Sequence, residues 1–317
     1  MSVESVNELK AKIEQLRKSR NAYIIVHNYQ LPEVQEIADM LGDSLALSKA
    51  AMGAKADVIV FCGVDFMAES AKILNPKKTV LLPVRQADCP MSLMANPGDL
   101  RKMKAKHPDA VVVCYVNSSA EVKALSDIAC TSANAVQIVK SLKEKEVLFV
   151  PDKNLGLYVE RFCPEKKIIF WEGFCPTHMQ LKAEDVIKTK AKYPDAPFIA
   201  HPECSPKVID LADHVASTSG FSPYIAKSPA KTFIVGTERG MVYALQKKHP
   251  DRTFVLPTEN LICPTMKMTT LASVAHALEV MEHKIEIPED IRRRAERCLR
   301  RMMEVSGESS NAAVAGY

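Results

Sequence analysis

Three copies of one short sequence pattern constrain the fold of this chain more than any other feature. Each copy is an apolar, β-prone run that ends in polar side chains, and the copies span residues 23–30, 110–117 and 197–203. The polar residues at equivalent places are His27 with Tyr29, Tyr115 with Asn117, and His201 with Glu203. Whether the likeness has a structural meaning depends on what else recurs at the same spacing.

Further residues recur at fixed offsets from the first polar residue of each copy. Twelve positions on there is an aspartate, and five positions later a hydroxyl: Asp39 and Ser44, Asp127 and Ser132, Asp213 and Thr218. A proline follows at offset 49, and a cysteine closes each copy at offsets 62, 60 and 62, as Cys89, Cys175 and Cys263. Five features recur at matching offsets, namely the polar pair, the aspartate, the hydroxyl, the proline and the cysteine. They predict three homologous units, which are too long for solenoid repeats and have the size of small domains.

Within each unit, short apolar runs alternate with helix-like segments, which predicts a parallel sheet with crossover helices. The fold class is therefore α/β, with three homologous small parallel-sheet domains around a pseudo-threefold axis and four strands in each. The expected domains are residues 1–105, 106–192 and 193–265. The first is expected to start with a helix over 5–20, and Pro32 to begin a helix that runs to Leu41.

The remaining residues, 266–317, contain two more helix-like segments. One covers 266–283, and the other opens at Pro288 and continues through Met303. Both are expected to pack back on the first domain and close the ring. The small, polar residues from Gly307 onward are interpreted as a flexible tail.

Composition excludes several classes of protein. Lys and Arg number 42 against 38 Asp and Glu, a net charge of +4, so Arg292 to Arg294 are interpreted as a solvated helix face and no nucleic-acid partner is expected. No apolar run has membrane-spanning length and the N-terminus does not resemble a secretory signal, which predicts a cytoplasmic protein without a membrane partner. Nine cysteines without any CxxC pair argue against a disulfide scaffold and a local metal motif.

Ligands bind at the carboxyl ends of parallel strands, and the polar pairs, the three hydroxyls and the three cysteines are all expected at such ends. If the three units face one another, one central cavity collects the polar pairs, the hydroxyls and three cysteines. Three thiolates fit zinc with a histidine as the fourth ligand, for which His178 is a candidate. They equally fit a 4Fe–4S cluster with one iron open to substrate as a Lewis acid. The polar surroundings favour the cluster, and both alternatives stay open.

Several of these segments resemble the quinolinate synthase family of NAD biosynthesis. The resemblance runs from about residue 20 to 270 in consistent order, through His27 to Gln30, Tyr115 to Ser118, Gly173 to Cys175, His201 to Glu203, Ser217-Thr218 and Cys263 to Lys267. It implies an enzyme that condenses iminoaspartate with dihydroxyacetone phosphate to quinolinate, phosphate and water. It also implies an oxygen-sensitive 4Fe–4S cluster on Cys89, Cys175 and Cys263, and L-aspartate oxidase as a possible transient partner that supplies iminoaspartate.

The same resemblance implies nine substrate-facing residues, which are His27, Tyr29, Ser44, Tyr115, Asn117, Ser132, His201, Glu203 and Thr218. Glu203 is the natural general base among them, because it is the only carboxylate of the three polar pairs, and Tyr29 and His27 are suited to relay protons. Two other functions compete with this one: a 4Fe–4S hydro-lyase acting on a small hydroxy acid, and a metal-binding metabolite sensor.

Other repeated or reactive residues receive structural interpretations. Asp39, Asp127 and Asp213 are expected to cap or fix the turn before the second strand of each unit. The other six cysteines are interpreted as small buried residues. The segment from Gly236 to Gly240 lacks Walker or GxGxxG spacing and is interpreted as a strand-to-helix turn.

Overall fold

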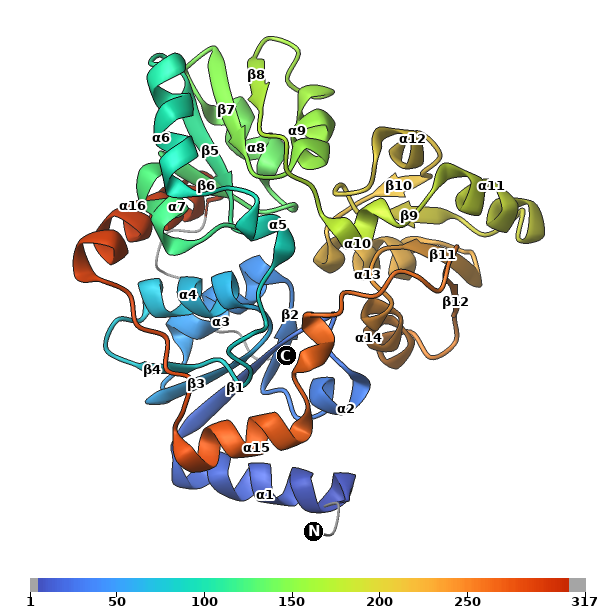
Figure 1. Ribbon diagram of the computed structural model, residues 1–317. Helices are drawn as coiled ribbons and strands as arrows, with labels where there is room; N and C mark the ends of the chain where they lie inside the picture. The colour runs from blue at the N-terminus through green and yellow to red at the C-terminus, as the bar shows by residue number, and fades with distance from the viewer. Residues whose placement is uncertain (1–4, 308–317) are drawn as a thin grey trace.

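The protein consists of three four-stranded parallel sheets with helices packed around them, as the computed structural model shows (Figure 1). The structure describes residues 5–307 apart from the side chain of Leu45, so the tail expected from Gly307 onward lies, beyond its first residue, outside the described residues. The three sheets have the same strand order, with the first strand of each unit between the second and the third. The prediction of three α/β units with four strands each is confirmed.

Each sheet takes its four strands from one continuous stretch of the chain. The first sheet contains β1 (Ala22–His27), β2 (Met40–Gly42), β3 (Val58–Cys62) and β4 (Thr79–Leu81). The second contains β5 (Val111–Tyr115), β6 (Ile128–Cys130), β7 (Glu146–Val150) and β8 (Lys167–Phe170). The third contains β9 (Phe198–Ala200), β10 (His214–Val215), β11 (Thr232–Gly236) and β12 (Thr253–Val255).

In every unit one helix lies between each pair of successive strands, and further helices follow the fourth strand. The first unit has α2 (Pro32–Gln35), α3 (Ser44–Gly53), α4 (Asp65–Leu74), α5 (Pro90–Leu93) and α6 (Pro97–Lys106). The second has α7 (Ala120–Leu125), α8 (Ala135–Ser141), α9 (Lys153–Glu160), α10 (Pro176–Met179) and α11 (Ala183–Lys192). The third has α12 (Pro206–Ile209), α13 (Thr218–Lys227), α14 (Gly240–Lys248) and the short 3-10 helix η1 (Met266–Met268).

The three repeated aspartates tie the second strand of each unit to the first. The carboxylates of Asp39, Asp127 and Asp213 accept hydrogen bonds, each at 2.8 Å, from the backbone N–H groups of Ile24, Val112 and Phe198, respectively. The N–H of each aspartate donates to the carbonyl of the same strand residue. The predicted structural role, fixing the chain before the second strand, is confirmed.

The expected helix from Pro32 to Leu41 is wrong in its second half. The helix ends at Gln35, and Met40 to Gly42 form β2, parallel to β1. The apolar residues at helical spacing suggested a longer helix, but the double hydrogen bond between Asp39 and Ile24 draws the chain against β1. A tertiary contact therefore overrides the local periodicity.

The terminal helices pack on two different units (Figure 1). Helix α1 (Val6–Ser19) begins at a capping box formed by Ser5 and Glu8, and α15 (Leu271–Val280) lies along it beside the first sheet. Helix α16 (Glu289–Val305) instead packs mainly against α7 and β6 of the second unit, which corrects the expectation that both terminal helices cover the first. The helix expected over 266–283 is also split, because the chain is extended at Thr269 and Thr270 between η1 and α15.

Apolar residues of the first two units and of α16 form one continuous core, whereas the third unit has clusters of its own. Arg292 to Arg294 pair with Glu289, Asp290 and Glu296 along α16. Arg293 is exposed, as expected of a solvated helix face, whereas the Arg292 side chain is only 11% exposed and also donates to the carbonyl of Ile73, so the expectation is wrong for Arg292. Among the helices within residues 5–307, none is long and apolar enough to cross a membrane.

Candidate active site

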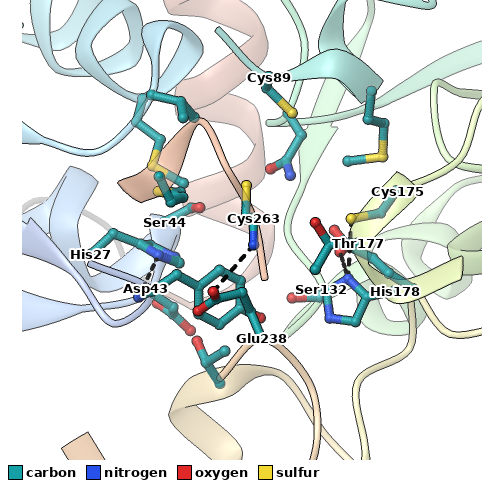
Figure 2. A pocket seen from close by; sticks show the side chains of 18 of the residues that line it. His27, Asp43, Ser44, Cys89, Ser132, Cys175, Thr177, His178, Glu238 and Cys263 are labelled. Atoms are coloured by element: carbon teal, nitrogen blue, oxygen red, sulfur yellow. Dashed lines mark hydrogen bonds and ion pairs between the residues drawn. The ribbon is translucent and has the colours of Figure 1, made fainter. Parts of the chain in front are cut away.

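One pocket lies where the carboxyl ends of the three sheets meet, and every residue proposed above for the site lines it (Figure 2). The lining includes His27, Tyr29, Ser44, Cys89, Tyr115, Asn117, Ser132, Cys175, His201, Glu203, Thr218 and Cys263. Side chains separated by up to 236 positions therefore meet because three sheets present equivalent edges to a common centre. Apolar residues, among them Val64, Phe66 and Met67, complete the wall near Cys89.

The three cysteines occupy equivalent positions, each after the last strand of its unit and directly before a proline. Cys89 and Cys175 are the N-caps of α5 and α10, and Cys263 precedes Pro264 and η1. All nine cysteines of the chain are free thiols, and the six that are interpreted as structural are buried. Burial raises the pKa of the Cys89 and Cys175 thiols, so these groups ionise only if a cation compensates the charge.

The spacing of the three sulfur atoms bears on which metal group they could hold. Thiolates that share one tetrahedral zinc lie roughly 3.8 Å apart, from Zn–S bonds of about 2.3 Å. Among residues 5–307, the set of three potential ligand atoms within 4.8 Å of one another comes from Cys175, His178 and Glu203, not from the three cysteines. At least one pair of the three sulfur atoms is therefore more than 4.8 Å apart.

A hydrogen-bonded chain connects the first and third units through a histidine of the second. Nδ1 of His178 lies 2.7 Å from a carboxylate oxygen of Glu203, and its Nε2 lies 2.9 Å from the hydroxyl of Thr237. The Thr237 hydroxyl is 2.6 Å from the phenol oxygen of Tyr29. His178 also lies 3.1 Å from the sulfur of Cys175, so the chain runs past the cysteine cluster. This arrangement can carry a proton between Glu203 and Tyr29.

Glu203 stays ionised although it is buried. Burial alone would raise its pKa, but the imidazoles of His201 and His178, with hydrogen bonds from His178 and Tyr115, lower the pKa to about 2. Burial, followed by the charge of Glu203, raises the pKa of the Tyr29 and Tyr115 phenols, which therefore keep their protons. The Glu203 carboxylate is thus surrounded by hydrogen-bond donors.

The two histidines at strand ends have the same local geometry. Nδ1 of His27 accepts the N–H of Tyr29 at 3.2 Å, and Nδ1 of His201 accepts the N–H of Glu203 at 3.4 Å. Burial lowers the pKa to about 4 for His27 and about 3 for His201, so both rings are neutral at physiological pH. With Nδ1 accepting, the proton resides on Nε2, and each ring can donate one hydrogen bond to a ligand.

Some site residues were not found from the sequence. His178 was considered only as a zinc ligand, and Thr237 and Glu238 lie in the segment interpreted as a plain turn. Glu238 is fully buried and lines the pocket, and Lys267 pairs with it at 2.9 Å. A cysteine followed by proline in all three units was the available signal for the cysteine loops. No comparable repeat marks His178 or Thr237.

Comparisons with known proteins identify the family of the chain. The model of the quinolinate synthetase A protein family matches residues 11–304. A quinolinate synthase of Geobacter metallireducens is 55% identical over 94% of this chain and 97% of its own length. Quinolinate synthases of Methanosarcina barkeri and Caldicellulosiruptor saccharolyticus are 55% and 49% identical, over 94% and 95% of this chain and 98% and 99% of their own. The chain therefore belongs to the quinolinate synthase family of enzymes of NAD biosynthesis.

Proposed function

We propose that this enzyme condenses iminoaspartate with dihydroxyacetone phosphate and that Cys89, Cys175 and Cys263 hold a 4Fe–4S cluster. The products are quinolinate, one phosphate and two waters, which balances the atoms of the two substrates. The observation that carries the proposal is the pocket itself, in which three cysteines from three sheets face imidazole, hydroxyl and amide groups. Membership of the family supports the same reaction.

The donor set fits an iron–sulfur cluster. The three thiols are free, they line one pocket, and at least one pair of their sulfur atoms is more than 4.8 Å apart. When bound by three cysteines, such a cluster leaves one iron open, where it supplies Lewis acidity to a hydroxyl or carboxylate of the substrate. The chain's own residues have to bind the substrates, orient them and move protons.

Binding is assigned to the neutral donors. Ser44, Ser132 and Thr218 are one hydroxyl from each unit, and with the N–H of His201 they can donate hydrogen bonds to carboxylate or phosphate oxygens. Oδ1 of Asn117 is buried and has no hydrogen-bond partner. An acceptor left open in a substrate pocket suits an N–H donor such as the imine of iminoaspartate.

Proton transfer is assigned to the chain from Glu203 to Tyr29. The low pKa of Glu203 makes it a weak base alone, but an imidazole that it holds at 2.7 Å can accept a proton and be stabilised as the cation. His178, with Glu203 as its partner, is therefore the group that takes up a proton passed along the chain through Thr237 from Tyr29. Tyr29, linked through Thr237, and His27 deliver protons during rearrangement and dehydration.

One preparation tests the metal group and the reaction together. Anaerobically purified protein is expected to contain about four iron and four sulfide per chain and to form quinolinate from the two substrates. Alanine at Cys89, Cys175 or Cys263 should abolish both, whereas Cys163→Ala, which removes a buried thiol outside the pocket, should not.

Two results would overturn the proposal. Zinc without sulfide would favour an ion held by Cys175, His178 and Glu203, which are the three residues with ligand atoms within 4.8 Å of one another. A fully clustered preparation that dehydrates a small hydroxy acid but forms no quinolinate would favour a hydro-lyase. The proposal also includes a cytoplasmic location and a transient contact with L-aspartate oxidase, because iminoaspartate is unstable and has to be supplied close to its site of use.

A further inference from the structure

The loops that carry the three cysteines are fastened to the segments that follow the third strand of each unit. One backbone hydrogen bond recurs in all three: the N–H of Asp65, Lys153 and Arg239 donates to the carbonyl two residues before each cysteine, at Ala87, Gly173 and Leu261, over 2.9, 2.8 and 2.8 Å. This bond fixes where each loop starts. It does not fix the cysteine itself.

In the first and third units a carboxylate also holds the cysteine. Oδ1 of Asp65 accepts the backbone N–H of Cys89 at 3.1 Å. Oε1 of Glu238 accepts the backbone N–H of Cys263 at 3.2 Å (Figure 2). The two acidic residues reach this place from adjacent positions, since Asp65 is the first residue of α4 whereas Glu238 precedes Arg239, the N-cap of α14. The same contact is therefore built twice with different side chains.

The second unit differs. Asp152 occupies the position equivalent to Glu238, but its Oδ1 caps α9 through the N–H of Asn154 and Leu155, and its buried Oδ2 has no hydrogen-bond partner. Cys175 has a contact with His178 instead, at 3.1 Å from its sulfur. Two of the three cysteines are thus held by carboxylates and the third by the imidazole of the proposed catalytic chain.

The surroundings of Glu238 show that its position is enforced. The side chain is fully buried, its Oε2 accepts the N–H of Gly240 at 2.7 Å, and Lys267 pairs with the carboxylate. A buried carboxylate is retained only where such partners compensate its loss of hydration. The backbone of Asp65 is fixed as the first residue of α4 and by the bond from its N–H to the carbonyl of Ala87.

We propose that Asp65 and Glu238 are positioning residues that hold Cys89 and Cys263 ready for the cluster. The inference rests on the proposed function, because it takes the three cysteines as the cluster ligands. Residues behind metal ligands fix the ligand's orientation, and their loss typically weakens metal binding by about 10- to 100-fold. Neither residue has to touch substrate, so their effect is on retention of the cluster.

The experiment measures the rate at which an iron chelator removes iron from anaerobic, fully clustered protein. Asp65→Ala and Glu238→Ala are expected to lose iron about tenfold faster or more. Asp65→Asn and Glu238→Gln keep an oxygen acceptor for the cysteine N–H and should restore most of the retention. Asp127→Ala is the matched control, because it removes the same kind of carboxylate-to-backbone bond at β5, away from the cysteines.

The outcomes separate this inference from the proposed function. If the unaltered protein contains no iron and sulfide, the cluster proposal fails. If it contains the cluster and the alanine variants lose iron at the unaltered rate, only the positioning role is overturned. Loss at the same raised rate in the amide and alanine variants would also overturn it, since charge rather than the hydrogen bond would then be responsible. Thermal unfolding of the apoproteins shows whether a variant is merely misfolded.

Discussion

The Nδ1 atom of His178 lies 2.7 Å from the carboxylate of Glu203, although the two residues belong to different units and both are buried. The ring of His178 also stacks on that of His201, with centroids 4.7 Å apart. A side chain that follows Cys175 by three residues is therefore fixed on two sides by the strand end of the third unit. The proposed chemistry depends on this contact.

Loss of either partner should reduce turnover. Glu203→Gln and His178→Gln are expected to lower kcat by about 10²- to 10⁴-fold, the usual contribution of a positioned acid or base. Quinolinate formation is measured at equal iron content, and His276→Gln, an exposed histidine on α15, serves as the control. Near-normal turnover of Glu203→Gln with an intact cluster would remove the base role.

Removing the cation beside Glu238 should destabilise the chain. Lys267→Met leaves a fully buried carboxylate without its 2.9 Å partner, which typically costs about 3–5 kcal/mol. The free energy of unfolding of the apoprotein in urea is the measurement. Lys231→Met, whose ammonium pairs with exposed Asp251 at 3.6 Å, should cost less than about 1 kcal/mol. In the double variant Lys267→Met/Glu238→Gln, part of the lost free energy of unfolding should be recovered. If the effects of the two single substitutions simply added in the double variant, the pairing would be contradicted.

Stability should depend on pH through Glu69. Burial raises the pKa of this carboxyl to about 7, partly opposed by Lys123. Between the unfolded value near 4.5 and pH 7 the folded chain keeps a proton that the unfolded chain has lost, so the group's contribution to stability falls as pH rises through this window.

The Glu69→Gln variant isolates that contribution. The free energy of unfolding of the variant minus that of the unaltered protein should rise by roughly 2 kcal/mol from pH 5 to pH 8. Denaturation curves at the two pH values measure this difference. Glu121→Gln, on the exposed side of α7, should show no such difference. A gain that is the same at both pH values would contradict the prediction.

A methyl group on the cysteine loop of the second unit should be poorly tolerated. A Cβ at Gly173 would lie 2.3 Å from the carbonyl oxygen of Pro151, so Gly173→Ala must displace the loop that leads to Cys175. We expect a loss of about 1–3 kcal/mol in stability and a lower iron content after reconstitution. Gly98→Ala, where the nearest atom is 3.3 Å away on an exposed side chain, is the control, and equal effects of the two would refute the steric explanation.

The architecture was predictable because it is repeated. The aspartate, hydroxyl and cysteine marks define three units, and the rule that ligands gather at strand ends then places all twelve proposed site residues in one pocket. Local detail was less predictable. The hydrophobic periodicity predicts a helix up to Leu41, but the contact of Asp39 with β1 ends it earlier. Helix α16 packs on α7 and β6 of the second unit rather than on the first unit.

Two of the residues that were missed, His178 and Thr237, have no counterpart in the other units. His178 and Thr237 act through contacts between units, which a comparison of unit with unit cannot reveal. Glu238 and Asp65 perform one task from positions that are out of register by one residue. Comparing the three units reveals only the residues that they share, whereas the proposed chemistry requires side chains that differ between the units.

The bonds from Asp39, Asp127 and Asp213 to their first strands are the same in all three units, whereas the side chains beyond those strands are not. A trimer assembled from three identical chains would have to place the same group on every wall of its cavity. Joining the units in one polypeptide removes this restriction, so that one wall can carry Glu203 while another carries Asn117. Covalent fusion therefore allows an asymmetric substrate to be recognised by a symmetric scaffold.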